Sequence, residues 1–374
     1  MKIERNDRLE RIFGMVGKEF RQLFRDPRMS RVVFLAPIIQ LVIFGYAVST
    51  DIWKTATFVV DHDRTRTSRE LVESLMASGY FQVVGRSDRS SDLEHSLDHG
   101  DAVVGVEIPA GFATTIQDGS GGKVQILLDG TNSNTALLAQ RYATQIFQNY
   151  GVRASKVETP MAIDLRERAW FNPDLSSRNY NVPAVVGMLI LLVSLLLTSL
   201  AVVREREIGT LEQLRVSPLS PVELIIGKSV PFAIIGLVDL TVVTTIALLW
   251  FGIPFRGSFA LLFFASALYI LSGVGLGLLI STISKTQQEA FMSTFLVMMP
   301  AILLSGFMFP VSSMPELFQW ITFVNPVRHY IEIVRSIFLK GTGLTSLWRQ
   351  YLWLLILGSI LLSFAATRFR KVAG

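Results

Sequence analysis

Long apolar runs dominate this sequence. Each holds about 20 residues, the length of an α-helix that crosses the hydrocarbon core of a bilayer. Hydrophobic residues make up 50% of the 374 residues and charged residues only 17%, whereas soluble domains average roughly 25% charged residues. We therefore predict a polytopic α-helical membrane protein with six transmembrane helices. The predicted spans are residues 31–50, 182–203, 230–251, 259–283, 291–309 and 347–367.

The distribution of Lys and Arg predicts how these spans are oriented. Basic residues are frequent before the first span, between the second and third spans, and after the last, and one, Lys285, follows the fourth. Loops rich in Lys and Arg remain on the cytoplasmic side of the membrane. Both termini are thus predicted to be cytoplasmic, in a multi-pass protein of the cell inner (cytoplasmic) membrane.

The segment between the first two spans, residues 51–178, has the character of a soluble domain. It contains 13 Lys and Arg against 17 Asp and Glu, so the rest of the chain carries the excess positive charge. Strand-like and helix-like stretches alternate along it, which is typical of a mixed sheet covered by helices. We predict an external (periplasmic) α/β domain. Its strands are Thr55–Asp61, Phe81–Arg86, Asp101–Pro109 and Lys123–Gly130, and its helices are Ser68–Ser78, with Ser68 as N-cap, Ser90–Gly100 and Ser133–Tyr150.

The N-terminal residues 1–30 form a separate amphipathic segment. Apolar residues recur at helical spacing, with Lys and Arg on the opposite face. This pattern predicts a helix that lies in the membrane interface and contacts the lipid bilayer. The apolar positions are Leu9, Ile12, Phe13, Val16, Phe20, Leu23 and Phe24.

A charged interruption, residues 204–228, separates the second and third spans. Its first half, "REREIGTLEQLRVSP", is predicted to be an amphipathic helix with Ile208, Leu211 and Leu214 on one face. It is either a docking surface, which we favour, or a solvated connector. The "GKS" that follows is not a phosphate-binding loop, because that motif needs a glycine where this chain has Val222. No nucleotide or other cofactor site is predicted on this chain.

Three stretches resemble the type-2 ATP-binding-cassette (ABC) exporter permeases. They are "REREIGTLEQLRVSPLSPVELIIGK", "LSGFMFPVSSMPELFQWITFVNPVRHYIEIVR" (Leu304–Arg335) and "WFNPDLSSRNYNVPAVVG" (Trp170–Gly187). The first resembles the cytoplasmic coupling segment of that family, and the second its external re-entrant hairpin, here residues 310–346. The large domain after the first span is similar to that of the drug-exporter branch.

The resemblance implies a function and partners. The chain would be the permease subunit of an ATP-driven exporter that moves hydrophobic or amphipathic, drug-like compounds outward. It would pair with a second permease, either itself or a paralogue, while ATP and Mg bind a separate ABC ATPase. A periplasmic adaptor is a further partner that the resemblance allows. The residues matched to the ATPase contact are Glu205, Arg206, Glu207, Thr210, Leu211, Glu212 and Arg215.

Few other residues are candidates for chemistry. Asp239 lies within a span, where an acidic residue marks either a functional site or a structural partner for a neighbouring helix. Glu332 and Arg335 have the i, i+3 spacing of an external ion pair. His95 and His99 have metal-ligand spacing, but a solvated helix face explains them better, so neither a metal site nor a catalytic residue is predicted.

Two alternatives of other kinds remain open from the sequence. The external domain would also suit a membrane receptor or sensor that binds a ligand outside the cell. A permease that exports a lipid or a glycan would have the same spans and the same coupling segment.

Overall fold

The computed structural model describes residues 2–48, 54–119, 121–131, 133–154, 171–172, 176–209 and 220–373. The chain divides into two compact units. One comprises Met1–Ser49 with Ala169–Gly374, and the other Thr50–Arg168. We call them the helical unit and the α/β unit.

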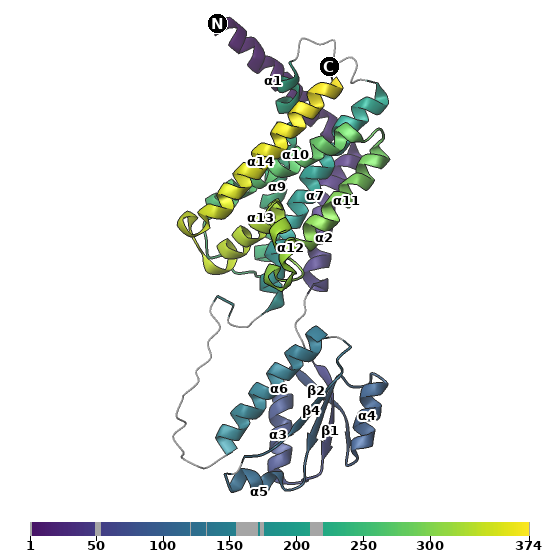
Figure 1. Cartoon of the computed structure of the whole chain (residues 1–374), viewed down its shortest axis with the longest axis vertical. Coiled ribbons are helices and arrows are strands. Elements are labelled where there is room, and N and C mark those ends of the chain that lie inside the picture. Colours follow the sequence, from purple (N-terminus) through teal and green to yellow (C-terminus); the bar gives the residue numbers. More distant parts are fainter. Residues whose placement is uncertain are drawn as a thin grey trace. The chain divides into compact units, whose positions relative to one another are not determined.

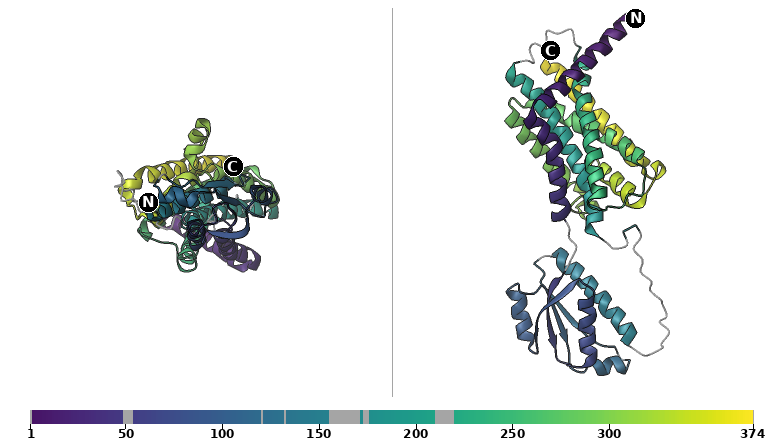
Figure 2. Two further views of the ribbon diagram at one scale, coloured as in Figure 1. Left: turned by 90° about the horizontal axis from the view of Figure 1, so that it is seen from below. Right: turned by 180° about the vertical axis from the view of Figure 1, so that it is seen from behind.

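The helical unit is built around one long helix, α7 (Ser177–Ile208), whose apolar residues are mostly buried. The other long helices surround it, and the start of α1 and the end of α14 lie at the same end of this unit (Figure 1 and Figure 2). They are α1 (Lys2–Arg25), α2 (Pro27–Ala47), α9 (Pro221–Leu249), α10 (Phe259–Ile283), α11 (Gln287–Leu303) and α14 (Leu344–Ala373).

Glycines allow α7 and α10 to pack closely. A Cβ atom on Gly277 would lie 2.8 Å from the carbonyl oxygen of Leu195, and one on Gly273 would lie 2.3 Å from the hydroxyl of Ser194. Any larger residue at these two positions would force the helices apart. Small residues at such crossings are a general feature of helix packing in membranes.

Five helices among the described residues are long and apolar enough to cross a membrane. They contain Ser30–Ala47, Ser177–Ile208, Val222–Leu249, Phe259–Ile283 and Leu344–Arg368. The span predicted at residues 291–309 corresponds to α11, which has only 17 residues and contains Pro300. The chain leaves the helix at Leu304 and turns at Gly306, whose φ is +81°. The structure therefore supports five spans, and the sixth stays a prediction.

The α/β unit contains a four-stranded sheet in the order β2-β1-β3-β4. The pairs β1–β2 and β1–β3 are parallel, and β3–β4 is antiparallel. Helices α3 and α6 lie on one side of the sheet and α4 on the other (Figure 1). The strands are β1 (Thr55–Asp61), β2 (Phe81–Ser87), β3 (Val104–Ile108) and β4 (Gln125–Leu128), and the helices are α3 (Arg66–Ala77), α4 (Ser90–Asp98), α5 (Phe112–Gln117) and α6 (Ser133–Ala154).

All four predicted strands of this unit are confirmed, and the first has the predicted bounds. The predicted N-cap of α3 is wrong. Thr65 is the cap, and its hydroxyl accepts a hydrogen bond from the backbone N–H of Ser68. The hydroxyl of Ser68 instead donates to Asp61 at the end of β1, at 2.7 Å. Helix α5 was not predicted, because its six residues are too few to show a helical period.

The region of the predicted hairpin, residues 310–346, folds as short helices. They are η1 (Val311–Ser313), α12 (Glu316–Thr322), α13 (Pro326–Arg335) and a π-helical turn, η2 (Ser336–Lys340). Asn325 connects this region to α11. Its Oδ1 accepts from the N–H of Val327, while its Nδ2 donates to the carbonyl of Ala301 at 2.7 Å.

Candidate functional site

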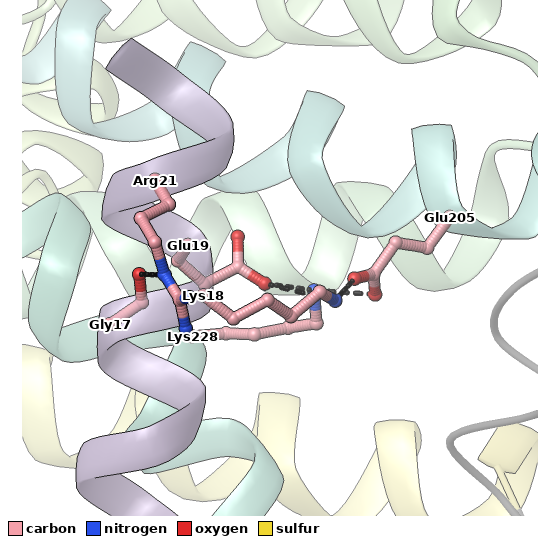
Figure 3. A network of polar contacts seen from close by, with 6 residues as sticks. All are labelled: Gly17, Lys18, Glu19, Arg21, Glu205 and Lys228. Atoms are coloured by element: carbon pink, nitrogen blue, oxygen red, sulfur yellow. Dashed lines mark hydrogen bonds and ion pairs between the residues drawn. The ribbon is translucent and has the colours of Figure 1, made fainter. Parts of the chain in front are cut away.

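A buried cluster of charged side chains joins three helices at one end of the helical unit (Figure 3). At its centre is Lys228 of α9, whose side chain is fully buried. Its Nζ lies 3.1 Å from Oε1 of Glu19 in α1 and 2.5 Å from Oε2 of Glu205 in α7. Lys18 of α1 pairs with the other oxygen of Glu205. We call these four residues the Lys228 cluster.

The Lys228 cluster has as many carboxylates as ammonium groups. A single buried ion costs several kcal/mol to desolvate, and it is tolerated only where close partners compensate it. Each carboxylate here comes from a different helix than Lys228. The cluster therefore fixes the end of α7, the later part of α1 and the start of α9 relative to one another.

Two further ion pairs support the same junction. Arg11 of α1 lies 3.3 Å from Glu223 in the first turn of α9, and Arg204 of α7 lies 3.2 Å from Asp26, between α1 and α2. Glu223 also forms a capping box with Ser220 at the start of α9. The chain thus enters α9 at a fixed position, immediately after the segment that contains the predicted coupling residues.

The structure changes the interpretation of the predicted coupling helix. Residues 204–208 are the last turn of α7, which ends at Gly209 with a φ of +79°. Thr210, Leu211, Glu212 and Arg215 lie outside the described residues. A glycine in the left-handed conformation is a common helix terminator, so the amphipathic pattern of this segment is interrupted at Gly209.

Three residues of the predicted ATPase contact lie in the described part of the chain, and each of them has a partner within the chain. Glu205 belongs to the Lys228 cluster. Arg206 donates to the carbonyl of Ser284 at 2.7 Å, and Glu207 accepts from the backbone and side chain of Gln287. Arg206 and Glu207 thereby connect the end of α7 to the α10–α11 turn. Their role in binding an ATPase stays a prediction.

Asp239 lies on α9, about three helical turns beyond Lys228. Its side chain is 1% exposed, and neither carboxylate oxygen has a hydrogen-bond partner among the described residues. The structural interpretation of Asp239 required a hydroxyl or a cation from a neighbouring helix. The described part of the chain supplies none, and the role of Asp239, functional or structural, stays a prediction.

The predicted ion pair between Glu332 and Arg335 is replaced by other contacts. Glu332 accepts a hydrogen bond from Gln350 at 2.7 Å. Arg335 donates to the carbonyls of Tyr180, Gly306 and Phe307 and lies 3.5 Å from the centre of the Tyr180 ring. Its guanidinium therefore joins α13 to the start of α7 and to the turn after α11, where backbone carbonyls were closer than the carboxylate one turn away.

In the α/β unit, the histidines make local contacts. Among the described residues no group of three or more His, Cys, Asp or Glu could hold a metal ion. His95 and His99 stack on each other with ring centroids 3.9 Å apart. Glu107 accepts from Ser90 at 2.6 Å and contacts His62 at 3.1 Å. The hydrogen bond from Ser90, followed by that of His62, keeps the pKa of Glu107 below its usual value.

Sequence reasoning missed the Lys228 cluster. Lys228 was counted only as one of the basic residues of a cytoplasmic loop. A signal was available in α1, where Glu19 lies midway between Met15 and Leu23 on the face that is buried in the structure. A carboxylate on an otherwise apolar helix face indicates a buried cation elsewhere in the fold.

Comparison with known proteins identifies the family. A helical membrane unit with five candidate spans and an inserted α/β unit defines a multi-pass membrane protein. The model of the family described as "ABC-2 family transporter protein" matches residues 29–367. The chain belongs to this family. It is therefore the permease, or transport, subunit of an ABC transporter and not its ATPase, and the family implies an ATPase subunit as partner.

Individual relatives span nearly the whole chain. It is 36% identical to the probable multidrug ABC transporter permease YbhR of Escherichia coli, over 96% of this chain and 98% of the relative. It is 32% identical to the probable multidrug ABC transporter permease YbhS of the same organism, over 88% and 89%. The inner membrane transport permease YhhJ, also of Escherichia coli, is 27% identical over 98% of both chains.

Proposed function

We propose that this permease exports hydrophobic or amphipathic, drug-like compounds across the inner membrane, driven by ATP hydrolysis on a separate ATPase. Two of the relatives above are named as probable multidrug permeases, and a third as an inner membrane permease. In the proposed orientation both termini and residues 209–220 are cytoplasmic. The α/β unit is then periplasmic, where it would gate the exit or contact an adaptor.

The Lys228 cluster is the observation that carries the proposed mechanism. Two members of the cluster flank residues 209–220 in the sequence. Glu205 comes shortly before this segment, and Lys228 comes shortly after it. A force applied to the segment therefore acts on α7 and α9 together, and on α1 through Glu19. An ATPase that docks on this segment would move the three helix ends as one body, which is how binding energy is converted into a change between inward-open and outward-open states.

A second permease, either another copy or a paralogue, would complete the transport path. Helix α11 packs mainly against α7 and α10. Its outer face exposes large apolar side chains, which suit either lipid or a partner helix. Phe291, Met292, Leu296, Met299 and Leu303 form this face. The family resemblance favours the partner helix, with the compound passing between the two permeases.

The test is ATP-dependent export of a lipophilic dye from cells or proteoliposomes that contain the permease and its co-purified ATPase. We expect Glu207→Lys combined with Glu212→Lys to leave expression intact and abolish both export and stimulated ATPase activity. The matched control is Glu73→Lys with Glu94→Lys, two exposed residues of the α/β unit. Export at the wild-type rate by the first variant would refute docking at this segment.

The same assay separates the alternatives. A receptor would show no ATP-dependent movement of any compound. A lipid or glycan exporter would translocate labelled lipid or glycan while leaving the dye untouched.

A further inference from the structure

An open cavity of about 630 Å³ lies where α1, α2 and α7 meet. Its lining is strongly basic. Four cations, from Lys18, Arg21, Arg25 and Arg204, face a single carboxylate, that of Asp26. An anion is therefore the kind of ligand that this cavity would attract.

Two of the four cations are already paired. Lys18 contacts Glu205, and Arg204 contacts Asp26. Among the described residues, the side chain of Arg21 donates to the backbone carbonyl of Gly17 in its own helix, at 3.1 Å (Figure 3). Within the described ranges, neither Arg21 nor Arg25 contacts an acidic side chain. Since these two arginines are one helical turn apart, two guanidinium groups without a counter-ion lie side by side.

The start of α2 adds to the positive potential. Pro27 lines the cavity and is the first residue of α2. The first turn of a helix has N–H groups without intrahelical partners and carries a partial positive charge. Backbone and side chains thus favour the same kind of ligand.

An exposed apolar stripe runs along α1 beside these arginines. Leu9, Phe13 and Phe24 are 47%, 70% and 59% exposed, and their spacing places them on one face of the helix with the half-buried Phe20. The ring of Phe24 stacks on Phe20 and on Phe34 of α2, with centroids 6.4 and 6.2 Å apart. A neighbouring side of α1, with Met15 and Leu23, is buried. An exposed apolar stripe flanked by Arg is the pattern of a helix at the surface of a bilayer.

The position along α2 indicates the depth of the cavity. The candidate span of α2 begins at Ser30. Ser30 follows Pro27 by three residues, about 4.5 Å along a helix. The cavity is thus at the polar edge of the hydrocarbon region, the level of the lipid phosphates. A soluble acidic protein would not need the exposed apolar stripe of α1 next to the basic lining, so the lipid is the better match.

We propose that this cavity binds the headgroup phosphate of an anionic phospholipid, held by Arg21 and Arg25. The acyl chains lie against Phe20, Phe24 and Phe34. Basic pockets between membrane helices are established sites for such headgroups. The bound lipid is a fixed component that orients α1, distinct from the compounds that are transported. Because Lys18 belongs to both the cavity and the Lys228 cluster, the lipid would stabilise the junction as a whole.

The test uses the full-length protein in a neutral detergent, titrated with phosphatidylglycerol or with phosphatidylcholine. Native mass spectrometry counts bound lipids, and thermal unfolding measures stabilisation. We expect phosphatidylglycerol alone to bind stoichiometrically and to raise Tm by several degrees. Arg21→Gln combined with Arg25→Gln is expected to weaken this binding roughly 10- to 30-fold, since two cations near the lipid surface are lost. Both side chains are exposed, so the variant is expected to fold.

The matched control is Lys285→Gln with Arg368→Gln. These residues are also exposed and belong to the helical unit, but they do not line the cavity. The control is expected to bind phosphatidylglycerol as the wild type does. Equal stabilisation of the arginine variant and the control would overturn the site, because it would show only general attraction to anionic lipid.

Two further measurements show whether the phosphate that the cavity binds belongs to a lipid or to a soluble compound. Glycerol 3-phosphate and inorganic phosphate are expected to give no stabilisation at millimolar concentration, because they lack acyl chains. Stabilisation by either one to the same extent as the lipid would reassign the cavity to a soluble phosphate compound. If the arginine variant kept its lipid and lost its ATPase subunit on purification, the surface would be a protein contact, and the lipid proposal would be wrong.

Discussion

Two charged residues buried in helix α9, Lys228 and Asp239, have contrasting surroundings. Lys228 is 0% exposed, and carboxylates from two other helices surround its ammonium group. Asp239 is 1% exposed, and its carboxylate has no hydrogen-bond partner among the described residues. The two side chains are therefore buried to the same extent, and they differ in whether oppositely charged or hydrogen-bonding groups surround them. A buried ion that is paired holds a structure together, whereas a buried carboxyl without partners is an unsatisfied group that the fold retains at a cost.

This contrast predicts different roles for the start of α9, at Lys228, and for its middle, at Asp239. The Lys228 end is a joint that fixes α1, α7 and α9. At Asp239, the carboxyl can accept a proton, the cationic group of a transported compound or a group from the second permease. Substitutions at the two positions should then have different consequences for stability and for transport.

The largest effect is expected from Lys228→Met. It leaves Glu19 and Glu205 with one ammonium group between them, and removing one partner of a buried ion pair costs about 3–5 kcal/mol. We expect a strongly lowered Tm and a loss of folded protein in fluorescence-detected size-exclusion chromatography. The control is Lys285→Met, which removes an exposed lysine of the same helical unit and should leave Tm within a degree or two.

Adding Glu19→Gln to Lys228→Met should restore much of the lost stability. The double variant keeps the pair between Lys18 and Glu205 and leaves no carboxylate without a counter-ion. We expect its Tm to lie closer to that of the wild type than to that of Lys228→Met. A double variant less stable than either single variant would show that Glu19 and Lys228 act independently, which is incompatible with the cluster.

A smaller effect on stability is expected from Asp239→Asn. The substitution removes a carboxyl that makes no hydrogen bond to any described residue, so Tm should stay within a few degrees of the wild type, as for most changes that break no contact. Export of cationic compounds should fall at least tenfold while that of neutral compounds persists. A resistance panel divided by compound charge, measured beside Tm, checks both parts. An equal loss for all compounds with a lowered Tm would show a structural role.

The smallest effect concerns Glu107 of the α/β unit, which is paired but partly exposed. Its pKa is lowered in the folded state by Ser90 and His62. The resulting stabilisation is present above the unfolded pKa, about 4.3, and is lost as the pH falls through the lower folded value. Glu107→Gln should therefore reduce stability slightly at pH 7 and make it less sensitive to acid below about pH 4. Hydrogen exchange of the β3 amides in the intact protein, compared between pH 7 and about pH 4 for the wild type and the variant, measures this change in stability. An unchanged acid response would contradict it.

The sequence predicted the α/β unit in more detail than the junction. Each strand there is a short β-rich run bounded by turn residues, and β1 (Thr55–Asp61) was located to the residue. Such local patterns are visible along the chain. Helix α5 was missed because it is shorter than the period that would reveal it.

The Lys228 cluster could not be predicted for a different reason. Its members are far apart in the sequence, since Lys228 and Glu19 belong to helices separated by the whole α/β unit. Hydropathy shows where spans lie and not which helices are neighbours. For Arg335 the spacing to Glu332 suggested a local pair, while the carbonyls that it contacts come from two other segments. Only the tertiary fold reveals these contacts.

The proposed mechanism requires α1 and α9 to move as one body during transport, and a distance measurement tests this directly. The chain has no cysteine, so spin labels can be placed at Leu9→Cys and Val222→Cys, which are 47% and 62% exposed. Labelled permease, diluted with unlabelled permease and assembled with its ATPase, is compared without nucleotide and with ATP trapped. We predict the same Leu9–Val222 distance distribution in both states. In a second sample, undiluted and labelled at Val222 alone, the distance between the Val222 positions of two permeases is predicted to change. A shift of the Leu9–Val222 distance by more than about 5 Å, one helical turn, would show that the junction opens and would contradict the account.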